Sequence, residues 1–341
     1  MTVINDYVHD LGLFSWLDYV FSTVKNNATK ILNIQIFSSI IFASLCGVNR
    51  LSKIAKFTED PLVRKLLGLK KGLDDSNIKT RLSKLGQNGA NQLLETGLRF
   101  AGNWVKKCGL SRITIDCDST EHTVFGHQQG AAKGYNPKNR GKLSYHPLIC
   151  FVSEMKIVFN SWFRRDETNS KRAVCAFEYQ AHGWSKKRKM HAIRIVKEYV
   201  EKDFFGKIEM IPIYDYFCYC TNLRGLTSIR IHLLYGERAE SENWIENTKN
   251  QLYAGQTITN DFHVNDILWQ LSVMAYNISV LMRYDSDYKI WKQEPRTFRE
   301  WFIVVPGKVV TNARKTTVKM SVHYLYAKEW ERFTGKIPVA A

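Results

Sequence analysis

Two groups of polar residues in this sequence have the types and spacing that metal-dependent phosphate chemistry needs. The first group is Asp116-Cys117-Asp118-Ser119-Thr120, at the end of a predicted strand. Side chains alternate along a strand, so Asp116 and Asp118 point to one face and Cys117 points to the other. Two neighbouring carboxylates repel each other unless a cation lies between them, and carboxylate oxygens are common ligands of Mg²⁺. Acidic residues are also common at strand ends exposed to water, so this group alone leaves both interpretations open.

The second group lies along a predicted helix between Tyr235 and Lys249. At about 100° per residue, four side chains fall within about 60° of one another, on a stripe about 20 Å long. They are Tyr235, Arg238, Glu242 and Lys249. An amphipathic surface helix also carries its charges on one stripe. An amphipathic surface does not account for the mixture of side-chain types in this stripe, because a carboxylate suits a metal ion whereas Arg, Lys and Tyr suit phosphate oxygens.

Strands and helices must position these two groups. Alternating apolar residues predict strands at 113–118, 148–152 and 156–159, and again within 173–222, most clearly at 208–220. The spacing becomes helical at about 230–253, and 266–283 is apolar enough to form a core helix.

The first 108 residues are mostly helical in their spacing. Pro61 follows Glu59-Asp60 as at a helix start, and Asp74-Asp75-Ser76 is placed to cap the next helix. Short helices in a basic chain suit a helix-turn-helix-like DNA module, but a plain helical bundle fits equally well. The uncharged stretch between Lys30 and Arg50 is interrupted by Asn, Gln and Ser, which favours a buried helix over a membrane span.

The charge of the chain points to its partners. Its 49 Lys and Arg residues exceed its 32 Asp and Glu residues, for a net charge of +17. Nucleic acid is the leading partner for such a charge, and an anionic membrane surface is second. The composition, 45% hydrophobic and 24% charged, excludes a largely disordered chain, a collagen and a coiled-coil rod. The seven cysteines form no Cys-x-x-Cys pair, so we expect no zinc site and a reduced, cytosolic protein.

The spacing Tyr-x2-Arg-x3-Glu-x6-Lys, from Tyr235 to Lys249, resembles the signature of a large class of bacterial insertion-sequence transposases. These are DDE enzymes with a ribonuclease-H-like core. Further segments resemble the insertion-sequence group numbered thirteen-eighty, and the resemblance extends from about residue 57 to residue 330. The segments are residues 118–122, 130–137, 145–148, 214–216, 241–246 and 265–271.

The resemblance implies site residues, cofactors and partners. Asp118 matches the first metal-binding carboxylate and Glu242 the third, with Mg²⁺ as the cofactor and Mn²⁺ as its substitute. Tyr235, Arg238 and Lys249 would contact DNA. The implied partners are double-stranded DNA, as the terminal inverted repeats of the element and as target DNA, and further copies of the chain. The protein would be cytoplasmic and associated with the nucleoid, without a membrane partner.

One departure from the family bears on activity. The family carries its second Asp in an Asp-Ser-Gly-Phe-like motif on another core strand, and this sequence has no such motif. An internal deletion near residues 165–172 is the simplest explanation, and Asp215 is the least implausible substitute carboxylate.

We therefore expect a DDE transposase impaired in DNA cleavage and strand transfer. The alternative is an inactive DNA-binding remnant that competes at the element ends. A host nuclease with the same core is disfavoured by the preserved signature.

Three basic runs are candidate phosphate contacts, although each could equally be a solvated face. The first contains Lys133, Lys138, Arg140 and Lys142, within residues 122–153, which include no acid. The second is Lys186, Lys187 and Arg188, and the third extends over residues 308–319.

The expected fold class is α/β, with an incomplete ribonuclease-H-like mixed sheet. A helical DNA-binding domain at 1–108 would precede a core at 109–260, which holds a strand-rich insertion at about 171–225. A helical and basic tail at 261–341 would follow.

Overall fold

The computed structural model describes a mixed α/β chain that divides into two compact units. The first unit combines Met1–Thr168 with Asn243–Ala341, and the second is Asn169–Glu242. Within these units, the structure describes residues 2–22, 31–110, 113–133, 139, 142–164, 178–179, 185–186, 188–204, 207–220, 239–252, 258–286, 288–312 and 315–334. Among them, no helix combines the length and apolar character that a membrane span requires.

The described part of residues 1–108 is helical, as predicted. The helices are α1 (Thr2–Asp10), α2 (Leu13–Ser22), α3 (Asn33–Leu45), α4 (Leu51–Phe57), α5 (Pro61–Leu66) and α6 (Asp75–Lys107). Asp60 caps α5 by accepting the N–H groups of Leu62 and Val63, and Asp74 caps α6 in the same way. The uncharged stretch forms α3, whose residues from Ile36 to Leu45 are all buried.

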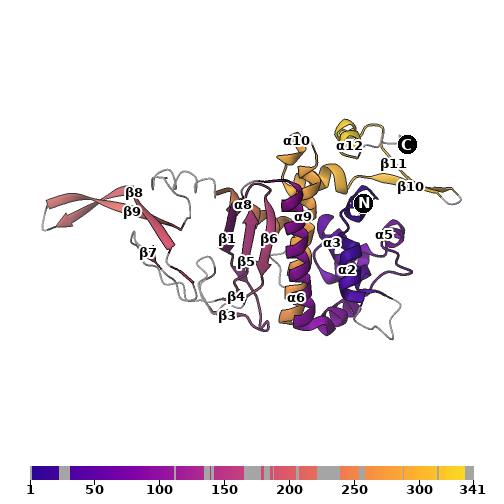
Figure 1. Cartoon of the computed structure of the whole chain (residues 1–341), viewed down its shortest axis with the longest axis horizontal. Coiled ribbons are helices and arrows are strands. Elements are labelled where there is room, and N and C mark those ends of the chain that lie inside the picture. Colours follow the sequence, from indigo (N-terminus) through magenta and orange to yellow (C-terminus); the bar gives the residue numbers. More distant parts are fainter. Residues whose placement is uncertain are drawn as a thin grey trace. The chain divides into compact units, whose positions relative to one another are not determined.

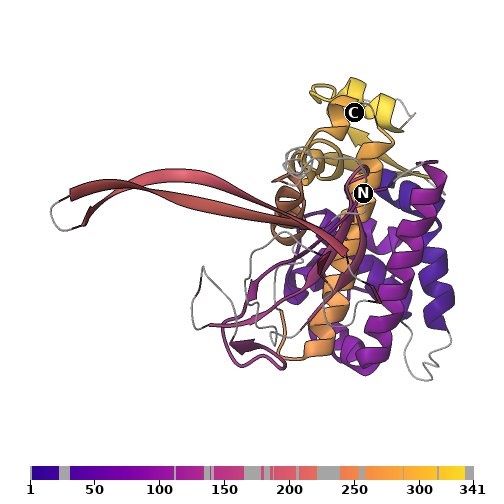
Figure 2. The same cartoon turned by 60° about the vertical axis from the view of Figure 1, so that its left-hand side comes forward.

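A three-stranded antiparallel sheet carries the first candidate group. It contains β1 (Ile115–Ser119), β5 (Leu148–Val152) and β6 (Ile157–Trp162) in the order β1-β5-β6, so the three strands predicted here are confirmed. Beside β6 lie α6 and the almost wholly buried helix α9 (Phe262–Tyr284), which pack against each other (Figures 1 and 2).

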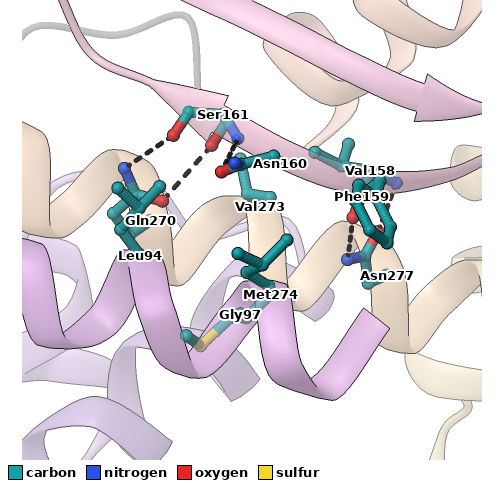
Figure 3. Close-up of a pocket in the computed structure, with 11 residues that line it drawn as sticks. Leu94, Gly97, Val158, Phe159, Asn160, Ser161, Gln270, Val273, Met274 and Asn277 are labelled. Carbon is teal, nitrogen blue, oxygen red and sulfur yellow. Dashed lines mark hydrogen bonds between the residues drawn. The ribbon is translucent and has the colours of Figure 1, made fainter. Parts of the chain in front are cut away.

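Side-chain amides from α9 bind the outer edge of β6 (Figure 3). The Asn277 carboxamide accepts the Val158 N–H and donates to the Val158 carbonyl, both at 2.8 Å. Two turns earlier on α9, Gln270 donates to the Ser161 carbonyl at 3.4 Å and accepts the Ser161 hydroxyl at 3.2 Å. Buried backbone groups must find hydrogen-bond partners, and here two amides supply them where a further strand would otherwise be needed.

A second small sheet lies between β1 and β5 in the chain. Its strands are β2 (His122–Thr123), β3 (Ala132–Lys133) and β4 (Leu143–Tyr145), in the order β2-β4-β3. The His122 ring is buried among Tyr145, Phe163 and Trp269, with ring centroids 6.0–6.5 Å away. This packing fits the structural role that is common for a buried histidine.

The predicted helical tail is wrong for residues 307–320. After α9 come α10 (Tyr288–Trp291), α11 (Pro295–Phe298) and η2 (Arg299–Ile303), but β10 (Gly307–Asn312) and β11 (Lys315–Met320) then form a hairpin before α12 (Ala327–Thr334). The β-branched residues of this segment favour strands. Gly307 also permits a close approach, because a Cβ there would lie 2.8 Å from Cγ1 of Val318.

The second unit is strand-rich in its described part. It contains β7 (Glu178–Tyr179), β8 (Arg188–Phe204) and β9 (Lys207–Cys220), in the order β7-β8-β9. Figures 1 and 2 show β8 and β9 as a long twisted ribbon. The strand predicted at 208–220 is confirmed. Among the described residues every strand pairing is antiparallel, so the mixed sheet, the ribonuclease-H-like topology and the domain boundaries stay predictions.

Candidate active site

Asp118 lies near the carboxyl end of β1, opposite Ile149 of β5. The Thr114 carbonyl accepts from the Ser153 N–H at 3.0 Å, and the Thr120 N–H donates to the Pro147 carbonyl at 2.9 Å. Hydrogen-bonded positions alternate along an antiparallel pair. The backbone groups of Asp118 therefore face β5, and its half-buried side chain is held on a strand that is fixed on both sides of it.

Cys117 and Cys150 form a disulfide across β1 and β5, with their Cα atoms 4.0 Å apart. The expectation that the cysteines are all reduced is therefore wrong for this pair. The cause is the strand register, because Cys117 lies opposite Cys150 in a non-hydrogen-bonded pair, where Cα atoms come closest. The bond joins the strand of Asp118 covalently to its neighbour.

Lys249 lies beside the turn that follows β1. Its ammonium donates to the Thr120 hydroxyl at 2.8 Å and to the Glu121 carbonyl at 2.5 Å. Thr120 is only 8% exposed, so these bonds form in a largely dry environment. A charged donor makes stronger hydrogen bonds than a neutral one. Lys249, the last residue of the second candidate group, therefore binds Thr120, the last residue of the first group, and Glu121, which follows it.

Among the described residues, the α-helix assumed in calculating the stripe from Tyr235 to Lys249 extends only from Ala239 to Glu246. Helix α8 (Ala239–Glu246) continues as the π-helix η1 (Asn247–Gln251), in which the Leu252 N–H donates to the Asn247 carbonyl at 3.3 Å. A π-helical turn is wider than an α-helical one, so Lys249 is rotated away from its calculated direction. Single π turns inside helices are frequent at functional sites.

Buried contacts hold α8 and η1 against the sheet of the first unit. Trp244 is 7% exposed and its ring lies 5.7 Å from the ring of Phe151 on β5. The Lys156 ammonium lies 5.8 Å from the centre of the Trp244 ring. The fully buried Thr248 donates its hydroxyl to the Trp244 carbonyl at 2.7 Å. These contacts fix the backbone from which Lys249 reaches Thr120.

The other residues of the predicted catalytic group are described only in part. Glu242 lies on α8, but its side chain is outside the described residues, as are Tyr235 and Arg238 entirely. Asp215 lies on β9 opposite Ile195, in the second unit, where only the backbone is described. The structure thus brings Lys249 to the Thr120 turn, and it leaves the remaining assignments as predictions.

The described residues do not bring together three His, Cys, Asp or Glu side chains that could hold a metal ion. Asp118 alone supplies a described carboxylate from the predicted ligand set. Carboxylate oxygen is the donor that Mg²⁺ prefers. The donor type therefore fits a divalent ion, although the described donors do not complete its site.

Among the predicted DNA contacts, Lys133 and Lys142 are exposed; Lys133 ends β3 and pairs with Leu143 of β4, and Lys142 directly precedes β4. Lys186, in the second unit, is also exposed. The side chains of the remaining four cannot be described: Lys138, Arg140 and Lys187 lie outside the described residues, and Arg188 begins β8 with only its backbone described.

Sequence reasoning missed a buried polar network beneath the sheet. Asp266 is 7% exposed and accepts from the Gln270 amide at 3.1 Å. Burial raises the pKa of Asp266 to about 6, an effect that the Gln270 bond opposes. The network continues through Gln270 to Ser161, whose hydroxyl accepts from the Trp269 indole at 3.2 Å. The small pocket drawn in Figure 3 adjoins this network, and none of the predicted site residues lines it.

These features describe a mixed α/β protein in which a strand-end carboxylate lies two residues from a threonine bound by a helical lysine. Residues 155–340 match the family described as transposase DDE domain group 1. This range is more than half of the 341 residues, so the chain belongs to the DDE transposase family, whose members are DNA phosphoryl-transfer enzymes. The range includes Glu242 and Lys249 and begins after Asp118. No curated protein and no solved structure shows significant similarity to the chain.

Proposed function

We propose that this chain is an insertion-sequence transposase of the Tyr-Arg-Glu-Lys signature class, in the group numbered thirteen-eighty, with impaired DNA cleavage. The family match over residues 155–340 carries this proposal. The contact between Lys249 and the Thr120 turn supports it, because it joins the end of the signature to the strand of Asp118. The core is ribonuclease-H-like, within domain boundaries near residues 108 and 260.

Asp118 and Glu242 are the proposed ligands of Mg²⁺, or of Mn²⁺ in its place. A divalent ion held by these carboxylates would supply activation of the attacking water or 3′-hydroxyl and stabilisation of the leaving oxygen. The reaction is in-line phosphoryl transfer, first as hydrolysis at an element end and then as strand transfer into target DNA. The chain itself contributes position and charge, with Lys249 holding the turn after Asp118 and Tyr235 and Arg238 contacting DNA phosphates.

An internal deletion near residues 165–172 accounts for the missing second Asp. Between Asn160 and Glu242 the sequence contains no Asp-Ser-Gly-Phe-like motif. Two carboxylates hold an ion more weakly and with poorer geometry than three, and Asp215, on β9 shortly before α8 in the sequence, is the least implausible substitute. Weak cleavage by the full-length chain is the expected result.

DNA binding depends less on the missing carboxylate than cleavage does. The net charge of +17 and the exposed Lys133 and Lys142 support binding to the phosphates of duplex DNA. The proposed substrates are the terminal inverted repeats and a target duplex, bound by more than one copy of the chain. The proposed location is the nucleoid.

A second candidate function follows from the missing motif. A chain that binds the element ends without cutting them would compete with an intact relative for the same DNA, or join it in mixed oligomers. It shares every proposed DNA contact with the first candidate and differs only in cleavage.

Duplex DNA carrying the element ends separates the two candidates. Purified chain is incubated with it in Mg²⁺ or EDTA, beside Glu242→Ala and the control Glu246→Ala, which removes an exposed carboxylate from the same helix. Nicking that needs Mg²⁺ and is lost only in Glu242→Ala supports an active enzyme, and Asp215→Asn is tested next. Salt-sensitive binding without nicking supports the competitor. Absence of binding at low salt contradicts both.

A further inference from the structure

The hairpin of β10 and β11 places two lysines directly opposite each other. The register pairs Lys308 with Lys319, between the pairs Gly307–Met320 and Val309–Val318. Directly opposed side chains on an antiparallel pair have Cβ atoms about 5 Å apart, and like charges at this distance destabilise the pair. A two-stranded hairpin is only marginally stable by itself. An unfavourable pair at this position therefore requires an explanation beyond the folding of the hairpin.

The sequence around this pair is free of acids. The sequence has no Asp or Glu from Trp301 to Lys328. Among the described residues, the ion pairs nearest in sequence join Arg296 to Glu300 and Lys289 to Glu329, and neither Lys308 nor Lys319 has such a partner. Lys308 is exposed and Lys319 is half-buried. The two ammonium groups are thus available to an anion from outside the chain.

Aromatic packing joins the segments on either side of the hairpin, which form its base. Met320, the last residue of β11, is 7% exposed, and Trp301 stacks on Tyr326 with ring centroids 4.3 Å apart. Trp330 of α12 stacks on Phe302 at 6.3 Å. The strands extend away from this base, and Figure 1 shows them reaching past the neighbouring helices of the first unit. The lysine pair is therefore carried on a fixed support.

We propose that the β10–β11 hairpin is a DNA-contact ribbon, in which Lys308 and Lys319 bind phosphates of duplex DNA. The proposal rests on the proposed function, since it assumes that the chain binds DNA. A two-stranded ribbon fits the major groove, which is about 12 Å wide. A phosphate between the two ammonium groups turns their repulsion into attraction, so the hairpin is stabilised when DNA is bound.

The composition of the lysine-bearing face favours DNA over an anionic membrane. On a strand, alternate residues share a face, so Val310 and Thr317 accompany the two lysines. Membrane-surface segments combine basic residues with large apolar ones such as Trp, Phe and Leu, and this face has none. Small polar and β-branched neighbours instead let the backbone of the ribbon approach a phosphate chain closely.

The salt dependence of DNA binding tests the proposal. The slope of log affinity against log salt changes by about 0.9 for each phosphate contact. In the full-length chain, the double variant Lys308→Gln with Lys319→Gln should reduce the slope by about 1.8 for a duplex carrying the element end, measured by fluorescence anisotropy. The control Lys292→Gln with Lys328→Gln removes the same charge from exposed positions outside the hairpin. It should leave the slope unchanged.

The variant Lys308→Arg with Lys319→Arg keeps both charges and should keep the wild-type slope, which shows that the slope depends on positive charge at these two positions. An unchanged slope in the Gln variant overturns the hairpin proposal. An equal reduction of the slope in the control variant, Lys292→Gln with Lys328→Gln, overturns it as well. Loss of binding to anionic phospholipid vesicles with an unchanged DNA slope would assign the hairpin to membranes instead. A wild-type chain without salt-sensitive binding would instead refute the proposed function itself, which keeps the two failures distinct.

Discussion

Replacing Lys249 by Met tests whether this lysine holds the turn after Asp118 or only contacts DNA phosphates. Met preserves most of the apolar stem and removes the ammonium that donates to Thr120 and Glu121. A hydrogen bond to a charged group contributes about 1.5–3 kcal/mol, so two such bonds set an upper limit of about 3–6 kcal/mol. Lys249 is half-buried, and water replaces part of what is lost. We expect the free energy of unfolding to fall by about 2–3 kcal/mol.

Urea unfolding of four proteins measures this coupling directly: wild type, Lys249→Met, Thr120→Val and the double variant. Residues joined by a hydrogen bond show interaction energies of about 0.5–3 kcal/mol in such a cycle. The control Lys142→Met removes an exposed lysine and should change stability by less than about 0.5 kcal/mol. Additive effects of the Lys249 and Thr120 substitutions would refute the positioning role. If Lys249→Met instead reduced the salt dependence of DNA binding without lowering stability, Lys249 would be assigned to DNA phosphates.

Three further predictions concern the sheet and the helix that covers it. Asp266→Asn should stabilise the fold at pH 8 by up to about 3 kcal/mol and leave it unchanged at pH 4, as urea unfolding at both pH values would show. Because burial raises the pKa of Asp266 from 3.8 to about 6, this residue contributes stability to the wild-type fold that is complete below pH 3.8 and is lost as the pH rises through about 6. Equal effects of the substitution at both pH values would contradict this. Asn277→Leu leaves the N–H and C=O of Val158 unbonded and should cost about 2–5 kcal/mol in the same assay, whereas a neutral result would show that water replaces the amide. Reduction of the bond between Cys117 and Cys150, which are 33 residues apart, should lower stability by about 4 kcal/mol in thermal unfolding, and a Cys117→Ser chain should not respond to the reductant.

Local patterns predicted the strands and core helices because each depends on residues close in sequence. The alternation at 113–118 and the apolar residues of 266–283 correspond to β1 and α9. Helix α5 begins at Pro61 and α6 begins within Asp74-Asp75-Ser76, as predicted. Each of these features is fixed by the spacing of a few neighbours.

The features that sequence reasoning missed have different causes. Cys117 and Cys150 lie opposite each other only because β1 and β5 pair in one register out of several possible. The change from α8 to η1 redirects Lys249, and a calculation with one constant turn angle cannot include it. The basic tail was expected to be helical, and only the β-branched residues of 307–320 indicated a hairpin.

The amides that bind β6 also make the two edges of the sheet different: strands can be added or lost at the β1 edge but not at the β6 edge. An edge strand normally offers a row of N–H and C=O groups to any extended segment that approaches it. On β6, Val158 and Ser161 already bond to Asn277 and Gln270, so another strand could pair there only by breaking buried hydrogen bonds. Loss of a strand on the β1 side leaves these bonds and the packing of α6 and α9 untouched. A chain built in this way can lose part of its sheet during evolution and keep the half that folds around α9.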